Sequence, residues 1–194
     1  MDCTEIERFT ASQISVQRYQ HSVSTAVQAK ELLDRYVASS DLYQKAWIAG
    51  IWHDCARQWT DAALLAFVDD RAFTVQSIER AIPMLLHGPV ASALLADRIP
   101  DISDTVLRAI RWHTLGSPDM GLIGAVIYIA DYLEPLRKHL TIDERNQMLA
   151  MSTLERLCLQ VSLNHLRYLE TTGRAPADST MDLVTFLRSG GTFT

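Results

Sequence analysis

The sequence predicts an all-helical protein that folds as a single domain. Apolar residues recur with the period of an amphipathic helix from one end of the 194-residue chain to the other, and no segment alternates in the way of a half-buried strand. With 48% hydrophobic and 21% charged residues, the composition is typical of a globular protein with one sizeable core. We therefore expect a helical bundle built around a central pair of buried helices.

The N-terminal half holds several segments with a helical pattern. Residues 14–37 form the first and longest of them. Asp41 is a plausible N-cap for a second helix, which ends in the pair His53-Asp54, and Thr60 is the expected N-cap of a short third helix. A weaker helical pattern covers 75–86, and Pro89 suits the first turn of the next helix.

The C-terminal half continues the helical pattern. We expect helices over 104–112, 141–151 and 153–169 and a short one over 181–187. The segment 120–133 is apolar on all sides, which indicates a helix at the centre of the bundle. These patterns divide the chain into an N-terminal segment (1–13), a main domain (14–172) and a C-terminal tail with a short helix (173–194).

Charge and cysteine content limit the possible classes of protein. A net charge of −5 offers no basic footprint for nucleic acid, so we expect no nucleic-acid partner. Three widely spaced cysteines with no CxxC pair suit a reducing compartment. The sequence shows no signal-peptide pattern, and its longest apolar run is too short to span a bilayer. We expect a cytoplasmic protein without a membrane partner; its oligomeric state stays open, a homodimer included.

Ionisable side chains interrupt the apolar pattern at six positions: His21, His53, Asp54, His87, His113 and Asp131. Burying such a group without a partner destabilises a fold or shifts the pKa of the group. Each residue has an ordinary explanation when taken alone. Asp131 could bond an arginine or cap a helix, the 53–54 pair could be a core histidine beside an exposed carboxylate, and His87 and His113 could cap helices or lie at the surface.

Together, the six residues indicate a metal centre. Imidazoles combined with carboxylates suit Fe, Mn, Co or Zn. Six ligands are too many for one catalytic ion with open positions, but they suit two ions, with Asp54 able to bridge them. Two neighbouring ions can hold a phosphoryl group and activate water, which predicts phosphohydrolase chemistry. The other two histidines, His139 and His165, have polar neighbours in the sequence and are expected to be ordinary surface residues.

The six residues stand in phrases that carry a family resemblance. The phrases are RYQHS (18–22), GIWHDCA (50–56), LLHGPV (85–90), AIRWHTLGSPDM (109–120) and IADYLEPLR (129–137). In this order they resemble the HD-domain metal-dependent phosphohydrolases with an H…HD…H…H…D pattern. The resemblance is closest to the YqeK-type symmetrical diadenosine tetraphosphate (Ap4A) hydrolases, and it covers roughly residues 14–172.

The resemblance implies an all-helical fold and a dinuclear site, most often with iron, although manganese or cobalt would take the same ligands. It implies that Ap4A, or another nucleotide, is cleaved by attack of a metal-activated hydroxide on a phosphorus, and for Ap4A the products are two ADP. It also implies a role for each residue. The first metal would be held by His21, His53, Asp54 and Asp131, and the second by Asp54, His87 and His113. The catalytic residues would be His53, Asp54 and Arg57, and the substrate would be bound by Arg57, Thr114 and Arg137.

Two departures from the family pattern concern the phosphate-binding side. Arg57 stands where the superfamily often has lysine, and residues 115–119 read LGSPD where the family often has TGRPN. An arginine keeps the charge but presents a planar fork of donors, so it holds phosphate with a different geometry. Two alternatives therefore stay open: another HD-domain phosphohydrolase acting on nucleoside mono- or triphosphates, and a helical metal-binding module without catalysis.

Overall fold

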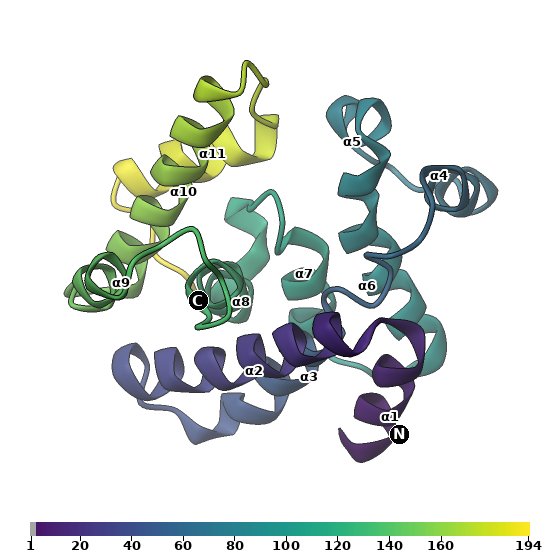
Figure 1. The fold of residues 1–194 in the computed structure, drawn as a ribbon, viewed down its shortest axis with the longest axis horizontal. Helices are drawn as coiled ribbons and strands as arrows, with labels where there is room; N and C mark the ends of the chain where they lie inside the picture. The colour runs from purple at the N-terminus through teal and green to yellow at the C-terminus, as the bar shows by residue number, and fades with distance from the viewer. Residues whose placement is uncertain (1–2) are drawn as a thin grey trace.

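The described part of the computed structural model, residues 3–194, is helical throughout and contains no strand (Figure 1). The all-helical prediction is confirmed. Eleven α-helices are present: α1 (Cys3–Gln13), α2 (Val16–Tyr36), α3 (Tyr43–Trp52), α4 (Asp61–Asp70), α5 (Ser77–Ala81), α6 (His87–Arg98), α7 (Asp104–Trp112), α8 (Gly121–Leu133), α9 (Ile142–Leu149), α10 (Leu154–Thr171) and α11 (Asp178–Arg188). Three short 3-10 helices join them: η1 (Ser40–Leu42), η2 (Pro83–Leu86) and η3 (Pro118–Met120).

The apolar helix α8 forms the centre of the core, as its sequence predicts. All residues from 123 to 130 on this helix are buried. It contacts α2, α3, α7 and α10, and Figure 1 places it near the middle of the molecule, between the α2–α3 pair and the C-terminal helices. Because α8 carries Asp131 near its end, this arrangement brings a carboxylate to the point where several helices meet.

Helices α2 and α3 pack against each other at very short range. A Cβ atom on Gly50 would lie 2.7 Å from the Cα of Ala26, so no larger residue fits there without moving a helix. This close approach places the end of α3, with His53, beside His21 on α2. The glycine in the phrase that precedes the His-Asp pair therefore has a packing role.

Some helix boundaries follow the sequence rules and some do not. Thr60 caps α4 by accepting a hydrogen bond from the N–H of Ala63, as expected. Asp41 is not an N-cap: it lies inside η1, and α3 begins after Leu42 without a side-chain cap. Residues 75–86 do not form one helix, because Pro83 lacks an amide hydrogen and disfavours helical geometry at the preceding residue.

Both ends of the chain pack onto the central bundle. Helix α1 contacts α3 and buries Ile6 and Thr10. Helix α11 contacts α10, and the Thr180 hydroxyl donates a 2.6 Å hydrogen bond to the carbonyl of Leu115. The three cysteines are free, and among the described helices none is both long and apolar enough to cross a membrane.

One buried ion pair fixes the short helix α5 against α7. The guanidinium of Arg111 binds both carboxylate oxygens of Glu79, at 2.7 and 2.8 Å, and the Glu79 side chain is fully buried. Replacing Glu79 by glutamine leaves the arginine without its counter-charge. We expect the free energy of unfolding, measured by urea denaturation, to fall by about 3 kcal/mol. Asp69→Asn, which removes the exposed pair with Arg80, is the control and should change stability much less.

Candidate metal centre

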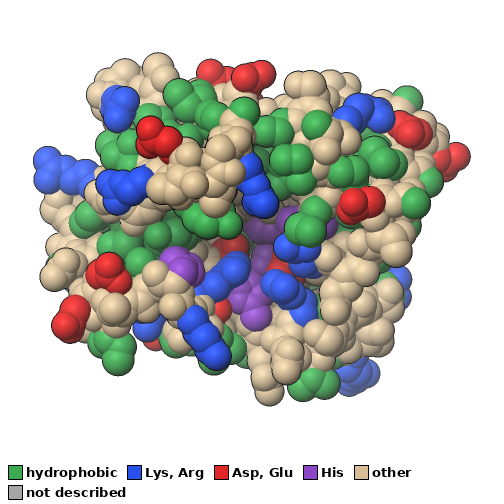
Figure 2. Space-filling view, turned by 45° about the horizontal axis from the view of Figure 1, so that its top comes forward, with side chains coloured by type: hydrophobic (Ala, Val, Ile, Leu, Met, Phe, Trp, Pro, Cys, Tyr) green, Lys and Arg blue, Asp and Glu red, His purple; other side chains and the backbone are tan. Residues whose placement is uncertain are grey.

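Six side chains from five places in the chain converge at one point of the bundle. His21 lies on α2, the pair His53-Asp54 follows α3, and His87 is the first residue of α6. His113 directly follows α7, and Asp131 lies near the end of α8. Figure 2 shows histidine side chains gathered in a hollow of the surface, with acidic side chains among them and Lys or Arg side chains around the rim. These are the six residues that the sequence singled out.

Adjacent residues rarely point the same way on a helix, yet the side chains of His53 and Asp54 meet, with His53 Nε2 3.6 Å from Asp54 Oδ2. Helix α3 ends at Trp52, and the chain then continues in turns, held by hydrogen bonds from Cys55 N–H to the Trp52 carbonyl and from Arg57 N–H to the Asp54 carbonyl. The end of the helix thus allows both side chains to reach one centre, as the sequence pattern suggested.

The carboxylate of Asp54 lies between two groups of histidines. Its Oδ2 atom is 3.6 Å from Nε2 of both His21 and His53. Its Oδ1 atom is 3.3 Å from Nε2 of His87 and 3.7 Å from Nε2 of His113. Each oxygen therefore faces a different group, which is the arrangement expected of a carboxylate that bridges two ions.

Asp131 adds a second carboxylate to the first group. Its Oδ1 atom lies 2.9 Å from Nε2 of His21 and 3.7 Å from Nε2 of His53. Ligand atoms around one ion, each at roughly 2.1 Å from it, lie roughly 3 Å apart when they are neighbours in an octahedron. The distances in both groups are close to this value. His21, His53 and Asp54 form one group that could hold an ion, and Asp54, His87 and His113 form a second. Asp131 adjoins the first group through its contacts with His21 and His53.

Hydrogen bonds at the Nδ1 atoms orient all four imidazoles. Nδ1 of His53, His87 and His113 donates to the carbonyl three residues earlier, at 2.6–2.7 Å. Nδ1 of His21 bonds a carboxylate oxygen of Glu134 at 3.0 Å. A carbonyl can only accept, so in three rings the proton is on Nδ1 and Nε2 carries a lone pair in the neutral ring. Such second partners are typical of metal-binding histidines.

The Nε2 atoms lie in two close pairs, an arrangement that suits a shared cation. Nε2 of His87 and Nε2 of His113 are 3.0 Å apart, and in neutral rings with Nδ1–H both would present lone pairs to each other. Nε2 of His21 and of His53 are 3.3 Å apart. A shared metal ion relieves this repulsion, since both lone pairs then bind it. The donor set and its geometry therefore fit two transition-metal ions.

Charge around the centre also favours bound cations. Although burial alone would lower it, hydrogen bonds to Asp131 and Glu134 raise the pKa of His21 to about 9. Burial lowers the pKa of His53 to about 4. Against the opposing effect of burial, the neighbouring histidines hold the pKa of Asp54 well below its usual range, so this group is a carboxylate at neutral pH.

Two further residues of the site carried no assigned role in the sequence analysis. Glu134 is buried, binds His21, and accepts a 2.7 Å hydrogen bond from the Leu136 N–H. Arg18 forms a 2.8 Å ion pair with Oδ2 of Asp54. Both residues stand inside the family phrases, and that was the only signal that could have found them.

The three proposed substrate-binding residues lie at the centre but differ in their partners. Arg57 lines the hollow and, within residues 3–194, forms no ion pair. The Thr114 hydroxyl is 3.2 Å from Nε2 of His87 and 3.0 Å from Nε2 of His113, so it faces the second group. Arg137 binds Asp131 through Oδ1 at 2.5 Å and the carbonyl at 3.0 Å. Of the three, Arg57 is the freest to meet a substrate.

His139 is exposed, as the sequence indicated, whereas His165 is half-buried and so is not an ordinary surface residue. Both line a cavity next to the centre, and His165 also lines the hollow that contains Arg57. Burial lowers the pKa of both imidazoles. The polar neighbours of His165 in the sequence indicated an exposed position, but at this residue helix α10 borders a cavity.

Comparison with known proteins identifies the family to which this chain belongs. Residues 18–136 match the HD domain, so the chain belongs to the HD-domain family. A symmetrical bis(5'-nucleosyl)-tetraphosphatase of Bacillus subtilis (strain 168) is 33% identical over 157 residues, covering 81% of this chain and 82% of the relative. The protein of the same name from Halalkalibacterium halodurans is 33% identical over 121 residues, 62% of this chain and 63% of the relative. Within the HD-domain family, the chain therefore groups with the symmetrical bis(5'-nucleosyl)-tetraphosphatases.

A solved structure supports the HD-domain fold. It is a crystal structure from Clostridium acetobutylicum, described as a predicted HD superfamily hydrolase involved in NAD metabolism. It superposes with a TM-score of 0.87 at 27% sequence identity and covers 98% of both chains. The match thus includes the N-terminal and C-terminal helices as well as the central bundle.

Proposed function

We propose that this protein is a metal-dependent hydrolase that cleaves diadenosine tetraphosphate symmetrically into two molecules of ADP. The single observation that carries the proposal is the position of the Asp54 carboxylate, with one oxygen facing the His21–His53 group and the other facing the His87–His113 group. The names of the relatives support the choice of substrate, and the geometry around Asp54 supports a site for two ions.

In this proposal, His21, His53, Asp54 and Asp131 hold one ion, and Asp54, His87 and His113 hold the other. When bound, a pair of transition-metal ions polarises phosphoryl oxygens and activates water at neutral pH. Iron is the proposed metal, although manganese and cobalt accept the same ligands. Asp54 remains a carboxylate at neutral pH because of its low pKa, so its role is to bind and not to transfer a proton.

The cleft in front of the centre has the charge that a polyphosphate needs. A cavity of about 480 Å³ opens from Asp54, His87 and His113, and four arginines line it: Arg18, Arg57, Arg137 and Arg174. Arg18 and Arg137 pair with Asp54 and Asp131. Within residues 3–194, Arg57 and Arg174 form no ion pair, so we propose these two as the first contacts for phosphate oxygens.

We propose two different roles for the four arginines that line this cavity. Arg18 and Arg137 hold the two carboxylates in place, because each guanidinium binds the acid at 2.8 Å or less. Arg57 and Arg174 orient the polyphosphate and neutralise charge that develops on the leaving ADP. Arg174, which the sequence analysis did not single out, thus joins Arg57 as a substrate-binding candidate. We also propose a cytoplasmic location, which the three free thiols support.

The decisive experiment measures metal and products in the same preparation. We expect purified protein to carry close to two transition-metal ions per chain by elemental analysis, and to convert Ap4A into ADP alone by chromatography. Formation of AMP with ATP would contradict symmetrical cleavage. Activity confined to nucleoside mono- or triphosphates would favour another HD-domain phosphohydrolase. A protein that takes up no transition metal would leave only a non-catalytic helical module.

A further inference from the structure

Two cavities meet at the metal centre and extend from it in different directions. The basic arm is the cavity of about 480 Å³ that holds Arg57 and Arg174. The aromatic arm is a second cavity, of about 620 Å³, with Tyr132 and Tyr168 in its wall. Six residues line both arms: His113, Thr114, Asp131, Arg137, His165 and Tyr168. The candidate ligands His113 and Asp131 thus lie at the fork between the arms.

The chemistry of the two arms differs sharply. The basic arm contains Arg18, Arg57 and Arg174, which the aromatic arm lacks. Apart from His113, Thr114, Asp131 and Arg137 at the fork, the aromatic arm is lined by rings, one amide and one aliphatic side chain: Tyr128, Tyr132, His139, Val161, Asn164, His165 and Tyr168. A polyphosphate suits the first lining, whereas an uncharged flat ring suits the second.

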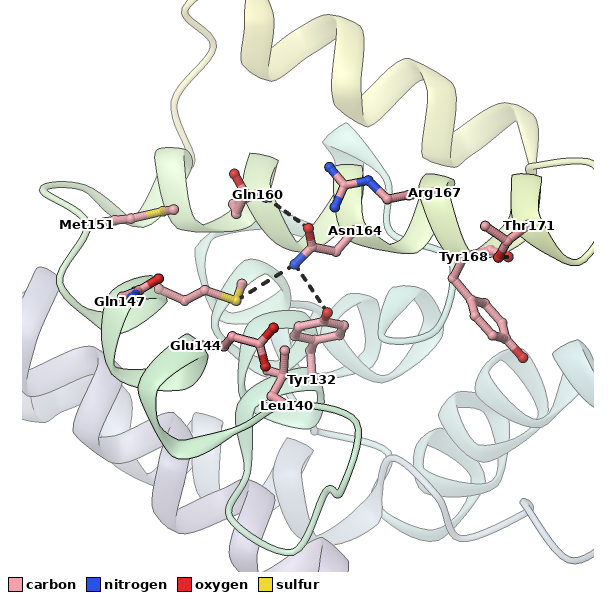
Figure 3. Close-up of a pocket in the computed structure, with 11 residues that line it drawn as sticks. Tyr132, Leu140, Glu144, Gln147, Met151, Gln160, Asn164, Arg167, Tyr168 and Thr171 are labelled. Atoms are coloured by element: carbon pink, nitrogen blue, oxygen red, sulfur yellow. Dashed lines mark hydrogen bonds between the residues drawn. The ribbon is translucent and has the colours of Figure 1, made fainter.

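The ring of Tyr132 is held rigidly at the start of the aromatic arm. Its hydroxyl accepts a 3.2 Å hydrogen bond from the side-chain amide of Asn164, and its ring meets His139 edge-on at 4.5 Å between centroids. Figure 3 shows Asn164 between Tyr132 and Gln160, whose amide donates to Asn164 Oδ1 at 2.9 Å. Tyr132 lines the same cavity as the candidate ligands Asp131 and His113, so this ring lies near the metal centre.

Tyr168 contributes a second ring to this arm, from α10. Its side chain is unusually open for an aromatic residue, with 57% of the residue exposed. In residues 3–194, no hydrogen bond to its hydroxyl is formed, so nothing in the fold accounts for its place at the rim. In Figure 3 it projects from α10 on the far side of Asn164 from Gln160. A flat ligand in the aromatic arm would cover it and gain a stacking contact.

We propose that the aromatic arm binds the nucleobase of one ADP half of the substrate, by stacking on the rings of Tyr132 and Tyr168. This inference rests on the proposed function. The phosphate chain then passes Thr114 and Arg137 at the fork and continues into the basic arm. A dinucleotide bound in this way presents the middle of its phosphate chain to the metal centre, which gives a physical reason for symmetrical cleavage.

The test compares two ligands on the metal-loaded protein, ADP and inorganic pyrophosphate, which share the diphosphate but not the nucleoside. Dissociation constants are measured by calorimetry for wild type, Tyr168→Ala and Tyr168→Phe. We expect Tyr168→Ala to bind ADP about tenfold more weakly, the size of one lost base-stacking contact. Its affinity for pyrophosphate should stay unchanged, and Tyr168→Phe should bind ADP like wild type. Tyr43→Ala, outside both cavities, is the matched control.

Three results would overturn the proposal. The first is a Tyr168→Ala variant that binds ADP with unchanged affinity. The second is a variant whose affinities for ADP and for pyrophosphate fall by the same factor. The third is a wild-type protein that binds pyrophosphate as tightly as ADP. Failure of the proposed function gives a different pattern, because wild type would then bind ADP with the expected dependence on Tyr168 yet release no ADP from Ap4A. Metal content, measured in each variant, excludes an indirect effect through the metal centre.

Discussion

Replacing Asp54 by alanine is expected to empty both metal positions and to abolish hydrolysis. Within residues 3–194, Asp54 is the one residue shared by both groups, with Oδ2 at 3.6 Å from His21 and His53 and Oδ1 at 3.3 Å from His87. Losing two ions that polarise phosphate and activate water should lower kcat/KM for Ap4A by roughly three orders of magnitude or more. Steady-state kinetics and elemental analysis of the same preparation measure both effects.

A second ligand variant separates a bridging role from a general loss of structure. In His113→Ala only the second group loses a ligand, because His113 contacts Oδ1 of Asp54 and Nε2 of His87. We expect this variant to retain close to one ion per chain, whereas Asp54→Ala retains close to none. Asp101→Asn, exposed and away from both cavities, is the control for charge. Equal metal loss in the two ligand variants would contradict the bridge.

Most of the fold could be predicted from periodicity because most helices here bury one face. The segment 104–112 forms α7 with the expected bounds, and the apolar segment 120–133 contains α8. The failures are local. Asp41 has the chemistry of a cap but lies within η1, and the pattern over 75–86 is interrupted at Pro83. In both places backbone geometry decides the structure, and apolar spacing carries no signal about it.

The six candidate ligands could be predicted because burial makes an ionisable side chain conspicuous. His53, Asp54, His87 and His113 are buried in the structure, as the apolar stretches around them indicated. Glu134 is equally buried but follows the apolar helix, where an acid before a proline resembles an ordinary helix end. Its role depends on an imidazole 113 residues away in the chain, and no local pattern encodes such a contact.

The two arms of the cleft could not be predicted from the sequence, because each arm combines residues from separate segments of the chain. The aromatic arm joins Tyr132 on α8 with Tyr168 on α10, and the basic arm joins Arg57 with Arg174 beyond α10. Each residue has an ordinary surface explanation in its own segment. Of the four residues proposed to contact the substrate in these arms, Tyr168 and Arg174 lie outside the residues 18–136 that match the HD domain.

Glu134→Gln is expected to weaken metal binding at the first group by 10- to 100-fold, the usual cost of losing a carboxylate that orients a metal-binding histidine. The carboxylate accepts from two donors, Nδ1–H of His21 at 3.0 Å and the Leu136 N–H at 2.7 Å. An amide of the same shape can accept from only one of them. Its NH2 group must face the other donor, so the His21 ring loses its charged partner or its orientation.

Competition with a chelator measures this effect without relying on turnover. We expect Glu134→Gln to release one ion per chain at a lower chelator concentration than wild type, while the second ion leaves at the same concentration as before. Glu134→Asp keeps the charge and should recover part of the affinity. If both ions leave Glu134→Gln earlier by the same factor, Glu134 supports the whole bundle and does not act through His21. The separation of the two release steps therefore tests whether His21 and Glu134 serve the first group alone.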